Sequence, residues 1–301
     1  MVLSPVVAGD QAESWRIARM DIARLQQWVG KTRSASDQVT PHPIAALAAT
    51  FDLDRALPVA NDPVPPLWHW LYFLEAHRES ELSDDGHAKR GGFLPPVPLP
   101  RRMWAGGRFE FHRPLRVGET FTRTSRIVDV REKKGRTGNL VFVTVRHEIG
   151  NVQGIALIED QHLVYRGNAT PGVPAPAAPP APADARWERV VQPGDVLLFR
   201  YSALTFNSHR IHYDRRYATE TEGYPGLVVH GPLVATLLLD LARQHRPEAN
   251  LARFEFRAVS PLFDTSPFKL CGRPEGDGKT ISLWATDAGG GLAMTAAATT
   301  P

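Results

Sequence analysis

A proline- and alanine-rich stretch at residues 168–187 constrains the architecture of this 301-residue chain more than any other feature. The stretch holds many of the 26 prolines and almost no residues that would join a hydrophobic core. Runs of this composition adopt extended polyproline conformations and act as semi-rigid spacers between folded units. We therefore expect an N-terminal domain at residues 1–167 and a C-terminal domain at residues 188–301, connected by this linker.

The predicted elements of the first half are helices followed by strands. Helical patterns near 13–29 and 67–79 precede a glycine- and proline-rich stretch at 91–107. Alternating, β-branched runs typical of strands come next. These runs are 107–115, 119–132, 140–149 and 154–165, with a hairpin-type turn at 133–138.

The second half repeats this coarse order. A strand is predicted at 196–202, and a helix at 231–245 follows from leucines at helical spacing. These leucines are Leu233, Leu237, Leu238 and Leu241, and the strand-like runs after them are 252–259, 267–273, 280–286 and 291–298. A long helix followed by antiparallel strands predicts an α+β fold with the helix packed on a sheet. The repetition of this order suggests a duplication.

Composition excludes several classes of function. The net charge is only +3 and the basic residues form no run, so we expect no nucleic-acid partner. The single cysteine, Cys271, rules out an intrachain disulfide and cysteine-rich zinc sites. We expect no membrane association and a cytoplasmic location, because no apolar run approaches membrane-spanning length and no signal-peptide pattern opens the chain.

The clearest candidates for catalytic residues lie in the segment 204–214. It places His209 and His212 beside an amide, Asn207, and a carboxylate, Asp214. The imidazole of His212 can accept or donate a proton near neutral pH, whereas Asn207 can only orient a carbonyl or a water. Asp214 either fixes the tautomer of the imidazole or caps the turn that follows it.

The helix predicted at 231–245 opens with Gly231, directly after His230. A helix N-terminus offers backbone N–H groups and partial positive charge, where a developing oxyanion would be stabilised. The His-x-x-His spacing of His209 and His212 lacks a carboxylate-rich partner motif, so we expect no metal. Ser208 has no nucleophile-elbow sequence around it and is not expected to act as a nucleophile.

These motifs resemble those of the MaoC-like hotdog hydratases and dehydratases. The resemblance rests on Leu204–Asp214 with Val229-His-Gly231, and in the first half on Pro66-Leu-Trp-His-Trp and the segment 91–107. The chain is most similar to the mesaconyl-C4-CoA and itaconyl-CoA hydratases and to the 3-hydroxyacyl-thioester dehydratases. That family has a curved antiparallel sheet wrapped around a helix, so the resemblance implies a tandem hotdog fold, with a catalytic second half and a first half that shapes the acyl pocket.

The same resemblance implies reversible hydration of an enoyl-CoA thioester, most simply one with a short dicarboxylic acyl group. His212 would then activate water, Asn207 would position it, and the Gly231 N–H would hold the enolate oxygen. The residues expected to bind substrate are His209, Arg210, His230, Arg101 and Arg102. Asn207 replaces the family's usual aspartate and His209-Arg210 replaces its usual Asn-Pro, which leaves the second acid or base unassigned.

No cofactor is expected, since CoA is part of the substrate. The sequence leaves the oligomeric state open, with a homodimer of two such chains as one arrangement. Two alternatives stay open. One is a 3-hydroxyacyl-thioester dehydratase of fatty-acid synthesis, and the other is a non-catalytic protein that binds acyl thioesters.

Overall fold

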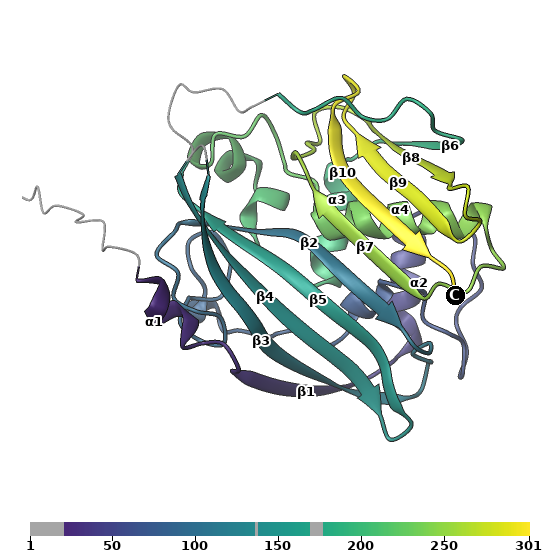
Figure 1. Ribbon diagram of the computed structural model, residues 1–301, viewed down its shortest axis with the longest axis horizontal. Helices are drawn as coiled ribbons and strands as arrows, with labels where there is room; N and C mark the ends of the chain where they lie inside the picture. The colour runs from purple at the N-terminus through teal and green to yellow at the C-terminus, as the bar shows by residue number, and fades with distance from the viewer. Residues whose placement is uncertain (1–20, 136–137, 169–176) are drawn as a thin grey trace, which may run out of the picture.

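The two halves of the chain contribute to one antiparallel sheet in the computed structural model, which describes residues 21–135, 138–168 and 177–301 (Figure 1). Within these residues the sheet has ten strands in the order β1-β3-β4-β5-β2-β7-β10-β9-β8-β6. The strands are β1 (Thr32–Gln38), β2 (Arg101–Phe111), β3 (Thr120–Gly135), β4 (Gly138–Asn151), β5 (Gly154–Arg166), β6 (Trp187–Val191), β7 (Arg253–Ala258), β8 (Phe268–Pro274), β9 (Thr280–Thr286) and β10 (Leu292–Thr299). The first half supplies five neighbouring strands and the second half the other five.

The seam between the halves is the pairing of β2 with β7. Gly106 lies opposite Arg257 there, and a Cβ on Gly106 would overlap the carbonyl oxygen of Phe256 and approach Arg257 Cα to 3.3 Å. A glycine is therefore required where the two backbones come this close. The register of β2 against β5 shifts between Trp104 and Gly106, a bulge that bends β2 at the same point.

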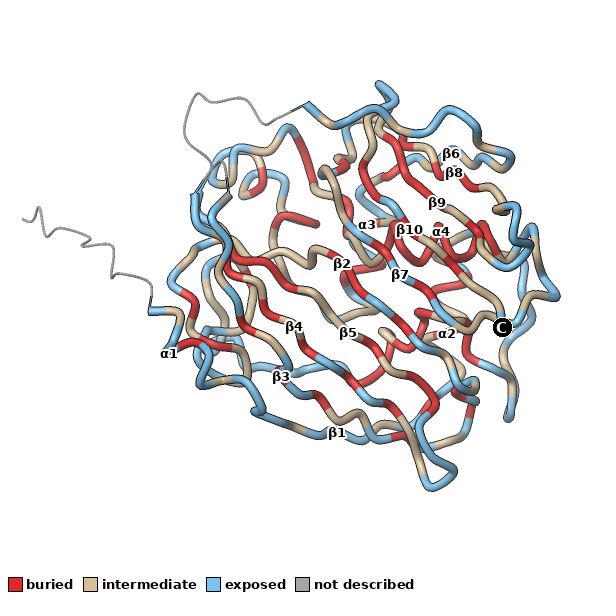
Figure 2. The backbone as a smooth tube through the Cα atoms, in the orientation of Figure 1, coloured by how far each residue is buried: buried red, intermediate tan, exposed pale blue. Residues whose placement is uncertain are grey.

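The central helix of the second half is α4 (Gly231–His245), which the leucine spacing predicts correctly. Ten consecutive residues, Leu233 to Ala242, are buried, so the helix is covered on all sides over nearly three turns (Figure 2). It packs against β8, β9 and β10 and reaches β2 of the first half. Burial of this helix fixes where its N-terminus lies relative to both halves.

The remaining helices are shorter. They are α1 (Ile22–Gln26), α2 (Pro41–Thr50), α3 (Asp195–Leu204), 3₁₀ turns at Trp68–Leu71, Glu79–Glu81 and Arg210–His212, and a π-helical turn at Tyr217–Thr221. Helix α2 packs on α3, so it ties the first half to the second behind the sheet. The main hydrophobic core spans α2, α4 and the strands around the seam.

Two helix predictions in the first half differ from the structure: the one at 67–79 is wrong, and the one at 13–29 is longer than the helix found in its described part. Residues 67–79 form only the 3₁₀ turn Trp68–Leu71, because Leu67 and Phe73 adopt left-handed φ angles of 69° and 57° that interrupt a helix. Of the segment 13–29, residues 13–20 lie outside the described part of the chain, and the rest contains only α1. Neither α2 nor β1 is among the elements predicted above.

The strand predicted at 196–202 is also wrong, because these residues lie in α3. Leu198, Tyr201 and Ser202 are buried at spacings of three and four residues, which is the periodicity of a helix face, and Asp195 stands in the first turn. Gly194 precedes the helix in an extended conformation that starts it. The strands predicted after α4 and the later strands of the first half are confirmed within one to three residues.

The proline-rich linker is described only in part. Residues 169–176 lie outside the described chain, and residues 177–186 contain no helix or strand but form a bridge between Pro180 and Gly291. Trp187, expected as the last linker residue, already begins β6. Of the helices in the described ranges, none has both the length and the apolar character needed to span a membrane.

Candidate active site

The segment that carries the histidines follows α3 and rests against a loop of the first half. The Ser208 hydroxyl donates a hydrogen bond to Gly86 O at 2.6 Å, and the Arg210 N–H donates to Asp85 O at 2.9 Å. Gly86 has a φ of 88°, and a Cβ there would overlap the carbonyl of Ser208. The two loops are therefore held together by backbone contacts that leave no room for another side chain.

His212 lies at the end of the 3₁₀ turn and is buried, with 8% of its surface exposed. Its Nδ1 lies 2.7 Å from Val228 O, and because a carbonyl only accepts, Nδ1 must carry the proton. The neutral ring therefore presents an unprotonated Nε2. Burial lowers the pKa of His212 to about 4, so the ring is neutral at physiological pH, which is the form in which Nε2 can accept a proton.

His230 stacks on His212 with ring centroids 3.8 Å apart and an interplanar angle of 19°. Its Nε2 shares a 2.8 Å hydrogen bond with the hydroxyl of Ser202 in α3. Burial lowers the pKa of His230 well below its usual value, and the neighbouring His212 lowers it further. Two stacked, desolvated imidazoles both remain neutral, so His230 supports His212 by packing.

The N-terminus of α4 opens into a cavity of about 940 Å³ that also receives His209, His212 and Asn207. Gly231 lines this cavity, and a Cβ on it would meet only Trp104 O, at 3.9 Å. The first N–H groups of a helix have no partner within the helix and point outward along its axis. The site thus brings a neutral imidazole and the N-terminus of a helix to one cavity.

Asn207 lines the cavity, but one end of its amide is used within the loop. The side-chain oxygen Oδ1 accepts a hydrogen bond from the backbone N–H of His209 at 3.1 Å. The backbone N–H of Asn207 donates to Ser202 O at 2.8 Å. Only the amide NH₂ remains for a substrate carbonyl or a water.

Asp214 does not orient His212, which corrects one of the two expected roles. Its carboxylate accepts hydrogen bonds from Arg210 Nη2 at 2.7 Å and from the N–H of Tyr217 at 3.0 Å. It therefore caps the turn after the histidine segment, the alternative role considered for it. Arg210 is engaged by this pair and lies over the ring of Tyr217, so it is not among the residues that line the cavity.

The two neighbouring arginines of β2 have different surroundings. Arg101 pairs with Glu222 at 2.9 Å and lies over Tyr224, which assigns it a structural role. Arg102 lines the cavity beside the buried Tyr165. Neighbouring residues of a strand point to opposite faces, which explains the difference. Of the three arginines expected to bind substrate, Arg102 is the one placed at the cavity wall.

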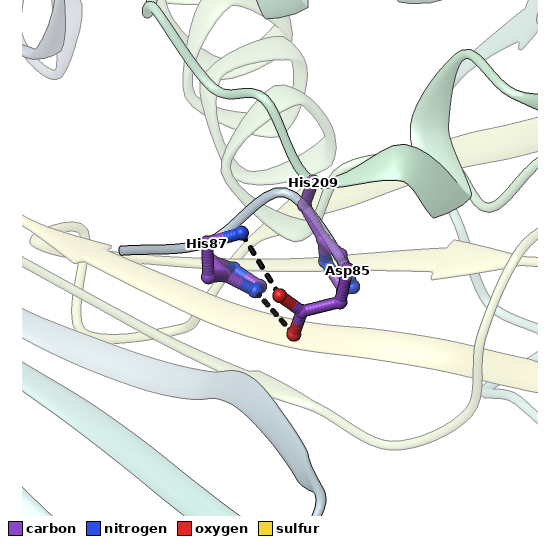
Figure 3. A group of neighbouring side chains, drawn as sticks. All are labelled: Asp85, His87 and His209. Atoms are coloured by element: carbon purple, nitrogen blue, oxygen red, sulfur yellow. Dashed lines mark hydrogen bonds and ion pairs between the residues drawn. The ribbon is translucent and has the colours of Figure 1, made fainter. Parts of the chain in front are cut away.

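A pair that the sequence analysis missed, Asp85 with His87, lies across from His209 (Figure 3). Oδ2 of Asp85 is 3.0 Å from His87 Nδ1, and Oδ1 accepts the His87 N–H at 2.9 Å. The rings of His87 and His209 are 4.0 Å apart. The donor atoms of the three residues lie within 4.8 Å of one another, a spacing compatible with a metal ion, but both carboxylate oxygens are already used by His87. We interpret the pair as a hydrogen-bonded dyad.

The first half lines the cavity with aromatic rings and a buried hydrogen-bonded pair, Glu159 with His69. Glu159 in β5 lies 2.9 Å from His69 Nε2 and accepts a hydrogen bond from Trp70 Nε1 at 3.2 Å. Burial alone would raise the pKa of Glu159, but the hydrogen bond and charge of His69 lower it overall. Trp70 also packs against Trp104 with ring centroids 5.0 Å apart. A polar, aromatic wall of this kind suits a short acyl group better than a long alkyl chain.

The fold and the site together define a tandem hotdog protein of the MaoC-like class. A MaoC-like dehydratase from Phytophthora capsici superimposes with a TM-score of 0.63 at 12% identity, over 93% of this chain and 98% of that one. A conserved protein of Mycobacterium tuberculosis with a double hotdog fold superimposes with a TM-score of 0.52 at 15% identity, over 90% and 96%. The α+β tandem hotdog predicted from the sequence is confirmed.

The chain belongs to the hydroxyacyl-thioester dehydratase type 2 family, whose profile matches residues 67–264. It is 48% identical to the mesaconyl-C4-CoA hydratase of Chloroflexus aurantiacus over 280 residues, which span 92% of this chain and 98% of that enzyme. The predicted resemblance is therefore confirmed along nearly the whole chain.

Proposed function

We propose that this protein is a hydro-lyase that reversibly hydrates a short dicarboxylic enoyl-CoA, with mesaconyl-C4-CoA as the substrate. The observation that carries the proposal is the bare Nε2 of His212, fixed by Val228 O, in the same cavity as the N-terminus of α4. The 48% identical relative named for this substrate supports the choice of acyl group. CoA enters as part of the substrate, and the mechanism uses no further cofactor.

In the hydration direction, His212 Nε2 accepts a proton from water as the water oxygen bonds to the β-carbon. The π electrons of the double bond move toward the thioester, whose oxygen becomes an enolate oxygen. The N–H of Gly231 stabilises this charge, because a donor aimed at a developing oxyanion in a desolvated site contributes strongly. Asn207 contributes its NH₂ to the position of the water or the carbonyl. A proton delivered to the α-carbon completes the addition.

The free carboxylate of a dicarboxylic acyl group requires a cation inside the cavity. Arg102 is placed at the cavity wall, and a guanidinium binds a carboxylate through two parallel hydrogen bonds. Trp70, Trp104 and Glu159 line the same cavity, and in this proposal they bound the space for the acyl group. In this proposal the second half, residues 188–301, carries the catalytic histidine, and the first half, residues 1–167, shapes the acyl pocket.

The family match supports one alternative, a 3-hydroxyacyl-thioester dehydratase of fatty-acid synthesis. That activity needs an apolar channel for a growing alkyl chain, whereas this cavity contains Arg102 and the Glu159–His69 pair. The dicarboxylic substrate is therefore favoured. A non-catalytic binding protein is disfavoured, because a buried imidazole with one nitrogen left bare costs desolvation that mere binding does not require.

A substrate panel tests the proposal. Mesaconyl-C4-CoA, crotonyl-CoA and trans-2-decenoyl-CoA are supplied separately, and the absorbance of the conjugated thioester is followed. We expect the fastest fall with mesaconyl-C4-CoA. Faster turnover of decenoyl-CoA would support the dehydratase of fatty-acid synthesis instead, and tight binding of all three without any absorbance change would support the non-catalytic protein.

A further inference from the structure

Hydration needs a proton at the α-carbon as well as a base for water, and two imidazoles of the second half, His212 and His209, line the cavity. Asn207 cannot titrate near neutral pH. Asp214 is tied to Arg210 and the Tyr217 N–H. His230 is stacked behind His212 and bonded to Ser202. Among the described residues, the ring of His209 has no hydrogen-bonded carboxylate to stabilise its charged form, so the group best suited to serve the α-carbon lies elsewhere on the cavity wall.

The Asp85–His87 dyad of the first half has the geometry of such a group. Because a carboxylate only accepts hydrogen bonds, the 3.0 Å contact places a proton on His87 Nδ1 and leaves Nε2 as the nitrogen that titrates. The second carboxylate oxygen holds the His87 N–H at 2.9 Å, which fixes the backbone beneath the ring. A carboxylate placed in this way orients an imidazole and stabilises its charged form.

The dyad faces the same cavity as His212. His87 lines the cavity, its ring lies 4.0 Å from that of His209, and His209 in turn lies 5.4 Å from His212 with the rings perpendicular. Gly86, next to His87, is pressed against Ser208, so the docking of the two loops sets the position of the dyad. About 21% of the His87 side chain is exposed, which lets it exchange protons with water between turnovers.

We propose that His87, oriented by Asp85, is the second catalytic residue and donates the proton that the α-carbon receives during hydration; this proposal rests on the proposed function. In the forward step one O–H bond of water breaks and its proton goes to His212 Nε2. The water oxygen bonds to the β-carbon, the double-bond electrons form the enolate, and the proton on His87 Nε2 bonds to the α-carbon. His212 is then charged and His87 neutral, and exchange with solvent restores both.

The surroundings of His87 favour this assignment over the other histidines. Burial lowers the pKa of His87, Arg102 and Arg90 lower it further, and the hydrogen bond and charge of Asp85 oppose them. His209 has no hydrogen-bonded carboxylate, and burial together with His87 and His212 lowers its pKa to about 2. Of His87 and His209, His87 is therefore the one whose charged form has a hydrogen-bonded anion.

The substrate itself would assist this protonation. Arg102 is the largest charged contributor that disfavours a protonated His87. A substrate carboxylate bound to Arg102 neutralises that field, so binding raises the affinity of His87 for a proton. A dicarboxylic acyl group would thus charge the acid that its own hydration requires.

The proposal is tested with His87→Gln and Asp85→Asn in the full-length enzyme, with the exposed Asp84→Asn as matched control. We expect His87→Gln to lower kcat for mesaconyl-C4-CoA hydration roughly 100- to 1,000-fold with little change in KM. The wild-type rate should fall as pH rises through the pKa of His87, and this falling limb should be absent in His87→Gln. In Asp85→Asn the limb should move to lower pH, because the imidazolium loses its anion.

Proton uptake gives a readout that does not depend on turnover. Succinyl-CoA, which has the second carboxylate but no double bond, is titrated into the protein by calorimetry in buffers of different ionisation enthalpy. We expect the wild type to take up a fraction of a proton, and His87→Gln to take up none. Butyryl-CoA, without the second carboxylate, should cause no uptake in either protein.

The outcomes separate the two proposals. A wild type inactive on every enoyl-CoA would remove the proposed function, whereas an active wild type matched by a folded His87→Gln, in rate and in pH profile, would remove only the role of His87. Stoichiometric zinc in the purified wild type that is lost in His87→Gln, with activity abolished by a chelator, would also overturn the role as a proton donor.

Discussion

Replacing Gly86 by alanine measures how closely the loop of Asp85 and His87 must lie on the histidine segment. The residue has a φ of 88°, where an L-residue costs about 1–2 kcal/mol. The new Cβ would also overlap the Ser208 carbonyl oxygen and lie 2.8 Å from its carbon, and backbone cannot rotate away as a side chain can. Overpacking of this kind costs about 1–3 kcal/mol more. We expect a total loss of about 2–5 kcal/mol in the free energy of unfolding.

Gly30→Ala is the matched control, because Gly30 has a φ of 89° with no atom within 4 Å of the new Cβ. It should lose only the conformational part, about 1–2 kcal/mol, with activity unchanged. In Gly86→Ala the loops must separate, and a displacement of about 1 Å near reacting groups can cost roughly 100-fold in rate. Urea unfolding and kcat with mesaconyl-C4-CoA measure both quantities. Equal effects of the two substitutions on stability and rate would refute the close docking of the loops.

Three further predictions concern the cavity. His212→Gln should keep the fold and lower kcat roughly 100- to 10,000-fold, the usual range for a lost general base. Circular dichroism measures the fold and the thioester assay measures kcat. Near-wild-type turnover would exclude His212 as the base. Arg102→Met should raise KM for mesaconyl-C4-CoA roughly 10- to 100-fold, the loss of a hydrogen-bonded charge pair, and leave the KM for crotonyl-CoA unchanged; an equal rise in KM with both thioesters would argue against carboxylate binding. Because burial lowers the pKa of His212 to about 4, below the value of about 6.5 of an unfolded histidine, the folded state binds this proton less tightly. Its contribution to stability is complete above about pH 6.5 and is lost as pH falls toward 4, by at most about 1.4 kcal/mol per unit. Urea midpoints between pH 7.5 and 4.5 should therefore depend less on pH in His212→Gln than in the exposed control His42→Gln, and parallel profiles would contradict the shift.

The parts of the fold that could be predicted from the sequence are those with a strong period. Leucines at helical spacing define α4, and β-branched alternation defines β4 and most later strands. The segment Val196–Ser202 contains aromatic and apolar residues that suit a strand equally well. Only its packing on α2 and the core selects the helix, and that contact is not encoded locally.

The residues of the candidate site also fall into two groups, those that could be predicted from the sequence and those that could not. His212 and Gly231 could be found because motif and helix start lie close together in the sequence. The adjacent Arg101 and Arg102 could not be separated until the start of β2 was known, since strand alternation alone puts one of them at the cavity. Asp85 and His87 lie in a turn-rich loop without any periodicity, and that loop is held against the histidine segment by contacts with Ser208 and Arg210, more than 120 residues away.

The pairing of β2 with β7 has an evolutionary consequence. Once two copies of an ancestral unit share one cavity, each copy is free to discard functions that its neighbour still performs. After such losses neither copy can return to an independent existence, because a lone descendant would lack part of the machinery. Activity then requires both copies in a single polypeptide. Substitutions that impair activity should therefore be as frequent in the half without the motif as in the half that carries it.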